Sequence, residues 1–160
     1  MSYLQPHRTA FADDVRGLSR AEHLVLFGVR AAALGHEDCP ALHRTFAALL
    51  GGEADAALCN LLVFVRVVGA STTRRLRLHA PGCCAVADDE RLVLWVIAAA
   101  QASLADGRDD ELRAHLAELL DHAPCEASLM AAQCLAAALT LSGLHLPPAC
   151  APPSPARTLH

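Results

Sequence analysis

Apolar residues recur along this chain at the spacing of α-helices. Residues 19–34, 53–68 and 88–106 are apolar on almost every side, so we expect these three helices to be central. Only residues 71–79 alternate polar and apolar side chains, as an extended segment would. Two further segments each carry four apolar residues at i, i+4, i+7 and i+8, which predicts one buried face per helix. The two sets are Leu42, Phe46, Leu49 and Leu50, and Leu112, Leu116, Leu119 and Leu120.

Local chemistry predicts where these helices begin and end. Ser19 and Glu22 have the spacing of a capping box, in which each side chain accepts a backbone N–H that the first helical turn leaves unpaired. Asp88 is expected to cap the fourth helix in a similar way. Pro124 separates the fifth helix from a sixth over residues 126–141. Glycines typical of helix ends follow four of the segments, at Gly35, Gly51, Gly107 and Gly143.

One stretch of the chain occurs twice. Glu22–Ala32 and Glu90–Ala100 align without a gap, 68 positions apart, and share a glutamate, a Leu-Val-Leu triplet and an aromatic residue. The following helices match at offsets of 70 and 75. Alanine- and leucine-rich helices can resemble one another by chance, but the shared order favours a duplication. We therefore predict an all-α fold, a six-helix bundle built from two tandem three-helix repeats with pseudo-two-fold symmetry.

The domain organisation follows from the same pattern. Residues 1–18 are expected to be an N-terminal arm and residues 147–160 a Pro-rich disordered tail. A single helical domain lies between them, with repeat one at 19–70, the inter-repeat loop at 71–87 and repeat two at 88–146. A chain of 160 residues is about one domain long and can bury roughly 70% of its unfolded surface.

The composition is unusually apolar for a soluble protein. With 54% hydrophobic residues and a mean hydropathy of +0.31, part of the surface is expected to be covered by a partner, most simply a second copy of the chain. No apolar run reaches the roughly 20 uninterrupted residues of a membrane span. The N-terminus also lacks the pattern of a secretory signal. We therefore predict a cytoplasmic homodimer that does not enter a membrane.

The charged residues exclude several function classes. A net charge of −4 argues against nucleic acid as a partner. All 13 basic residues are arginine, and the absence of lysine excludes a P-loop and a Schiff-base lysine. No nucleophile elbow, dinucleotide-binding motif or paired acidic cluster is present, so we expect neither an enzyme nor an organic cofactor. The leading hypothesis is a non-enzymatic helical binding module that acts as a regulatory or adaptor protein through contacts with a protein partner.

Histidine and cysteine lie close together in three places, which suggests zinc as an alternative. Neutral imidazole and thiolate are natural Zn²⁺ ligands. The spacing fits no known finger or ribbon, and some proximity is expected by chance among nine histidines and seven cysteines. A metal- or thiol-based sensor is therefore the second hypothesis. The candidate metal ligands are His36, Cys39 and His43, and His79, Cys83 and Cys84, while His122 and Cys125 form the third cluster.

The cysteines are expected to differ in reactivity. Cys83 and Cys84 precede a predicted helix N-terminus and follow Arg77 and His79, all of which favour a thiolate. The alternative is that these two cysteines are ordinary loop residues. Cysteines within apolar helices are usually buried, so two more are expected in the core, Cys59 and Cys134.

A third hypothesis is a small-ligand pocket between the two repeats. Trp95 and Phe27 occupy matching positions in the duplicated stretch and are candidates to line it. The dense arginine cluster would close it and bind an acidic group, because guanidinium forks match carboxylate and phosphate. Pairing of these arginines with nearby acidic residues is the simpler account of the cluster. Its members are Arg74, Arg75 and Arg77, and a separate Arg66 in the third helix must be paired or lie at an interface.

Overall fold

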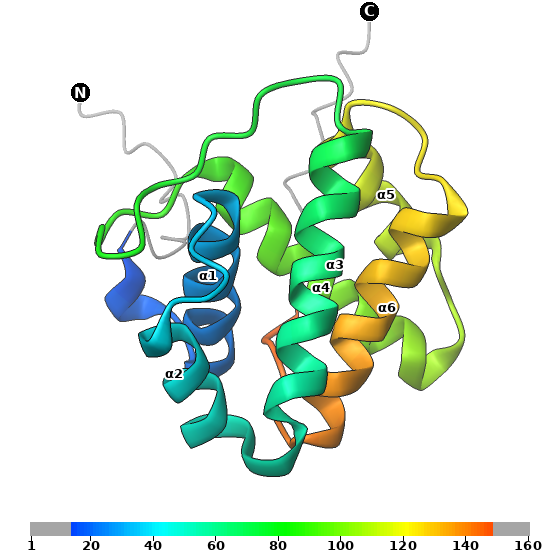
Figure 1. Cartoon of the computed structure of the whole chain (residues 1–160). Coiled ribbons are helices and arrows are strands. Elements are labelled where there is room, and N and C mark those ends of the chain that lie inside the picture. The colour runs from blue at the N-terminus through cyan, green and yellow to red at the C-terminus, as the bar shows by residue number, and fades with distance from the viewer. Residues whose placement is uncertain (1–13, 149–160) are drawn as a thin grey trace, which may run out of the picture.

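The structure is a computed structural model that describes residues 14–148 (Figure 1). Within that range no β-strand forms, which confirms the all-α prediction. Gly51–Glu53 forms a single 3₁₀ turn that joins two of the helices into one bent helical stretch, Pro40–Ser71. If this stretch is counted once, the described residues form five helical segments and not the predicted six. The helices are α1 (Arg20–Ala33), α2 (Pro40–Leu50), α3 (Ala54–Ser71), α4 (Asp88–Asp106), α5 (Asp110–Leu120) and α6 (Glu126–Leu141).

The predicted capping chemistry is present at α1 and shifted by one residue at α4. The Ser19 N–H donates to the Glu22 carboxylate at 2.7 Å, and the Glu22 N–H donates to the Ser19 hydroxyl at 3.3 Å. At α4 the prediction that Asp88 caps the helix is wrong, because Asp88 is the first helical residue and Ala87 precedes it. Glu90 does the capping instead, with its carboxylate accepting the Ala87 N–H at 2.8 Å.

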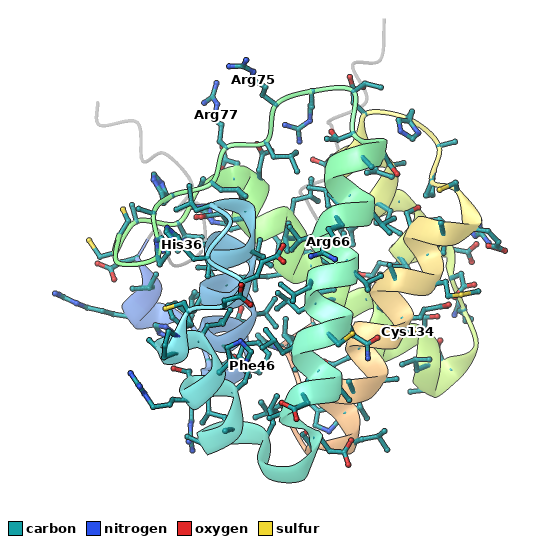
Figure 2. The ribbon with its side chains drawn as sticks, viewed as in Figure 1. His36, Phe46, Arg66, Arg75, Arg77 and Cys134 are labelled. Atoms are coloured by element: carbon teal, nitrogen blue, oxygen red, sulfur yellow. The ribbon has the colours of Figure 1, made fainter. Side chains whose placement is uncertain are left out.

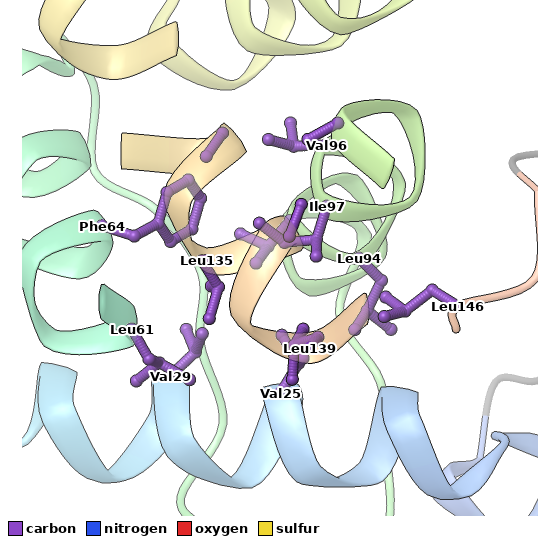
Figure 3. Packing of buried hydrophobic residues seen from close by; sticks show 14 of the residues in the cluster. Val25, Val29, Leu61, Phe64, Leu94, Val96, Ile97, Leu135, Leu139 and Leu146 are labelled. Atoms are coloured by element: carbon purple, nitrogen blue, oxygen red, sulfur yellow. The ribbon is translucent and has the colours of Figure 1, made fainter. Parts of the chain in front are cut away.

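The core lies where α1, α3, α4 and α6 meet (Figure 3). Helices α3 and α6 run side by side with extensive contact, and α6 also packs on α4. The buried side chains that fill this space come from all four helices, and each contributes about 1.5–3 kcal/mol on burial. They include Val25, Leu61, Phe64, Ile97 and Leu135.

Helix α1 approaches α3 closely because position 28 has no side chain. A Cβ atom added to Gly28 would lie 2.7 Å from a terminal methyl group of Leu61 and 3.2 Å from the Phe46 ring. Since carbon atoms do not approach so closely, any side chain at position 28 requires Leu61 to shift. The duplicated stretch in α4 carries Val96 at the matching position, so the two copies cannot pack on their neighbours in the same way.

The two halves of the chain share an order of helices but differ in packing. Helix α2 packs mainly on α3, whereas α5 packs mainly on α4. The connection from α2 to α3 is a 3₁₀ turn, while five residues separate α5 from α6. The tandem repeat and its pseudo-two-fold axis therefore stay a prediction. Most of the expected N-terminal arm and Pro-rich tail, residues 1–13 and 149–160, lie outside the described residues.

Helix α3 is less enclosed than its composition predicts. An 18-residue window within Pro40–Ser71 has a mean hydropathy of 1.6, yet only 33% of that window is buried. By length and composition alone this is the one described helical stretch that could cross a membrane, a test that core helices also pass. Val63 on α3 is 43% exposed. The prediction that Cys59 and Cys134 are core residues is wrong, because both thiols are exposed.

Candidate functional site

A buried ion pair joins α1 to α4. Arg30 is 2% exposed and Glu90 is fully buried. The guanidinium binds the carboxylate through two parallel bonds, Nε to Oε1 at 2.7 Å and Nη2 to Oε2 at 2.8 Å. The sequence predicts pairing of the arginine cluster with the acidic start of α4, which Arg74 and Asp89 form, but it gives no partner for Arg30. The available signal was Arg30, the charged residue within the apolar run 24–33 of α1.

The same two residues hold the inter-repeat loop against the helices. Arg30 donates from Nη1 to the Cys83 carbonyl at 2.7 Å and from Nη2 to the Ala85 carbonyl at 2.6 Å. Glu90 accepts the His79 backbone N–H at 2.8 Å. Together with the Val15 N–H, which donates to the Cys84 carbonyl at 2.8 Å, these polar contacts fix the course of the loop.

Asp89 anchors the preceding part of the loop. Its carboxylate accepts from the Arg74 guanidinium at 2.7 Å and from the Arg77 N–H at 2.6 Å. Burial alone would raise the pKa of Asp89, but the bonds from Arg74 and Arg77 outweigh it and lower the pKa. For Glu90 burial likewise opposes ionisation, and the Arg30 guanidinium with two backbone N–H groups lowers the pKa. Both carboxylates are therefore held ionised.

An apolar pocket of about 430 Å³ lies under this loop, between α1 and α3. Its walls include Val29 of α1, Phe64 and Val68 of α3, and Val93 of α4, while the loop supplies Leu76 among others. That volume lies within the range of about 300–1,000 Å³ typical of small-ligand sites. Two arginines are the charged residues that line it, Arg74 and Arg75.

The predicted ligand-binding residues are thus divided between several places. Arg75 and Arg77 both point away from the helices, and Arg77 lines a separate pocket (Figure 2). Phe27 lines another pocket, of about 370 Å³, between α1, α2 and the loop. Trp95 lies against the buried His115 of α5, with ring centroids 5.8 Å apart. The structure therefore brings Arg74 and Arg75 together at one pocket and leaves Phe27 and Trp95 elsewhere.

The predicted metal clusters do not bring three candidate ligands together in the described part of the chain. Among residues 14–148 no group of three or more His, Cys, Asp or Glu side chains is placed to hold a metal ion. Cys83 and Cys84 line the pocket that contains Phe27. His43 instead has its Nε2 within 3.1 Å of the Glu37 carbonyl, in the turn with His36 and Cys39. The geometry offers no support for zinc at these positions.

Cysteines at two helix N-termini have perturbed acidity, which the sequence analysis did not predict. Cys39 precedes α2, and backbone N–H groups led by that of Leu42 lower the pKa of its thiol. Cys125 precedes α6, and the Ser128 N–H, followed by the Ser128 hydroxyl, lowers the pKa of that thiol. A thiolate is favoured there because unpaired N–H groups point at the sulfur.

His122 ties the end of α3 to the segment between α5 and α6. Its Nε2 is 2.6 Å from the Ser71 carbonyl and its Nδ1 is 2.7 Å from the Ala123 carbonyl. Both ring nitrogens donate to these acceptors only when the imidazole is protonated. The two carbonyls, that of Ser71 first, therefore raise the pKa of His122.

A broad uncharged face covers the outer side of α3 and α6. Residues 56–65 of α3 and residues 127–141 of α6 include no charged side chain. Arg66 lies at one edge, where its guanidinium pairs with Glu37 at 2.6 Å, as the sequence analysis required of it. We call this surface the α3/α6 face. Its exposed members are Ala56, Cys59, Val63, Met130, Cys134 and Leu141.

The chain matches no protein-family model, no curated protein and no solved structure. The roles of the candidate site residues are therefore argued from the geometry of this structure.

Proposed function

We propose that this protein is a non-enzymatic helical binding module that forms a homodimer through the α3/α6 face and acts in a regulatory or adaptor role. The observation that carries the proposal is the exposure of an apolar, uncharged surface on two adjacent helices. Helices at a free surface ordinarily present charged side chains to water. Here Met130 is 62% exposed and Leu141 is 77% exposed.

A second copy of the chain is the occupant that the chemistry of this face favours. Interfaces of permanent homodimers are more apolar than those of transient complexes, and charged residues are depleted at their centres. A two-fold contact places the same patch on both partners, so an uncharged patch brings no like charges together. The net charge of −4 would otherwise oppose self-association.

The proposed duplication also supports the α3/α6 face as the dimer interface. It pairs Cys59 of α3 with Cys134 of α6, and both of these cysteines are exposed on the α3/α6 face. If the two three-helix repeats are related by a pseudo-two-fold axis, the extensive contact between α3 and α6 lies near that axis. A surface of this kind could then pair with its own copy.

Light scattering tests the proposal directly. The wild-type protein should have about twice the monomer mass of 16.9 kDa at micromolar concentration. Val63→Glu and Met130→Glu should each shift the mass towards the monomer, because each buries a charge in the interface. Leu104→Glu is the matched control, since Leu104 is 48% exposed on α4 and lies outside the face.

Two results would contradict the proposal. One is a wild-type monomer at high micromolar concentration. The other is equal dissociation by Leu104→Glu, which would show a general effect of added charge. Sedimentation of a monomeric wild-type protein with phospholipid vesicles would assign the face to a membrane surface instead.

A further inference from the structure

We propose that the pocket under the inter-repeat loop binds a small amphiphile with an acidic head group, its chain between α1 and α3 and its carboxylate or phosphate at Arg75. This site is independent of the α3/α6 face. The pocket walls are mainly aliphatic and aromatic, and the arginines lie at the loop that covers them. An apolar interior with arginines at its edge matches a molecule with an apolar body and one anionic end.

The two arginines at the pocket have different roles. Arg74 is occupied, because its guanidinium binds Asp89 at 2.7 Å and that contact also raises the pKa of Arg74. Arg75 is exposed and has no carboxylate partner among residues 14–148. Arg75 is therefore the group that can bind an incoming anion, and its fork suits either a carboxylate or a phosphate.

The wall that carries Arg75 is fixed before any ligand arrives. The Thr73 N–H donates to the Leu120 carbonyl at 3.2 Å, and the Thr72 hydroxyl donates to the Arg74 carbonyl at 3.1 Å. The Arg77 N–H is held by Asp89 on the other side. A pocket whose wall is already positioned loses less ordering entropy when a ligand binds.

The pocket volume limits the size of the ligand. A volume of about 430 Å³ lies towards the lower end of the range of small-ligand sites, so we expect a ligand with a single alkyl chain. Dodecanoate and dodecyl phosphate carry the two head groups on the same chain, and dodecanol is the uncharged analogue.

Isothermal titration calorimetry with these three probes tests the site. Dodecanoate or dodecyl phosphate should bind wild-type protein saturably at one molecule per chain, and the tighter of the two identifies the head group. Arg75→Ala should weaken that binding about five- to ten-fold, the loss expected for one charge-assisted hydrogen bond at an exposed position. Arg77→Ala is the matched control, because Arg77 is an exposed arginine of the same loop that does not line this pocket.

A second variant fills the pocket without disturbing the core. Gly69 lines the pocket, and a Cβ atom added there meets no other atom within 4 Å. Gly69→Leu should therefore fold at least as stably as the wild type, since leucine favours helices over glycine, and it should lose the probe.

Three results would overturn the proposal. They are the absence of saturable binding of both anionic probes, equal weakening by Arg75→Ala and Arg77→Ala, and undiminished binding by Gly69→Leu. Dodecanol binding as tightly as dodecanoate would also overturn it, because Arg75 would then contribute nothing. Since light scattering reports on a different surface, failure here leaves the dimer proposal standing.

Discussion

Replacing Arg30 by methionine should destabilise the protein far more than the same change at an exposed arginine. The substitution keeps much of the buried volume but leaves the Glu90 carboxylate without its cation. It also leaves the Cys83 and Ala85 carbonyls without donors. Removing one partner of a buried ion pair costs about 3–5 kcal/mol. That is a large share of the roughly 5–15 kcal/mol by which a domain is stable.

Arg66 and Glu37 provide a matched control. This pair has the same residue types and an N–O distance of 2.6 Å, but its side chains are 66% and 32% exposed. Exposed pairs contribute about 0–1 kcal/mol. Urea unfolding followed by circular dichroism should therefore give a loss of about 3–5 kcal/mol for Arg30→Met and of less than about 1 kcal/mol for Arg66→Met.

A double substitution separates the charge from the packing. Arg30→Met with Glu90→Gln removes both charges and keeps a carbonyl acceptor for one of the two N–H groups, those of Ala87 and His79, that donate to Glu90. The double variant should lose about 2 kcal/mol less free energy of unfolding than the sum of the two single variants. Each single variant leaves one charge buried without its partner, and the double variant leaves none. Equal losses at Arg30 and Arg66, or strictly additive single changes, would refute the assignment of Arg30–Glu90 as the main polar tie of the fold.

Acid titration gives an independent check of the same pair. The pKa of Glu90 is lowered in the folded protein. Its contribution is therefore fully present above the ordinary pKa of about 4.3 and is lost as the pH falls through the folded value. In Arg30→Met the buried carboxylate lacks its cation, so protonation relieves the defect. The difference in stability between this variant and the wild type should narrow as the pH falls below about 4.3.

Three further predictions follow from contacts elsewhere in the fold. Gly28→Ala should cost about 1–3 kcal/mol in urea unfolding, because the added methyl group displaces Leu61. Iodoacetamide labelling near pH 7 followed by mass spectrometry should modify Cys125 before Cys134, since both are exposed and the Ser128 N–H lowers the pKa of the Cys125 thiol. Because the pKa of His122 is raised, its contribution to stability is present below about pH 6.5 and is lost as the pH rises through the folded value. His122→Gln should remove that dependence from thermal unfolding measured between pH 6 and pH 8.

Features that depend on neighbours in sequence could be predicted, and features that depend on helix crossings could not. The α1 capping box needs only Ser19 and Glu22, three residues apart, and it forms as predicted. The helices end close to the predicted glycines for the same local reason. Arg30 and Glu90 are 60 residues apart, so their contact depends on how α1 crosses α4. No periodicity in the chain encodes that crossing.

The errors concerning α3 and α6 have a related cause. Helices that are apolar on every side give no signal of which side is buried. Cys59 and Cys134 were therefore assigned to the core, although both face outward. The aromatic pair failed differently. Phe27 and Trp95 occupy equivalent positions in the duplicated stretch, but their helices have different neighbours, so the two rings lie in different environments.

The differences between the two duplicated stretches explain much of the asymmetry of the fold. At matching positions, α1 has Gly28 and Arg30 where α4 has Val96 and Ala98. Gly28 lets α1 approach α3. Arg30 donates both to the loop carbonyls and to the Glu90 carboxylate. These two residues therefore set the spacing of α1 and α3 beside the pocket and hold residues 83–85 of the loop. The part of the loop that covers the pocket is held by Asp89 and Leu120. Val96 and Ala98 of α4 provide neither, so a ligand site is expected beside α1 and not at the equivalent surface of α4.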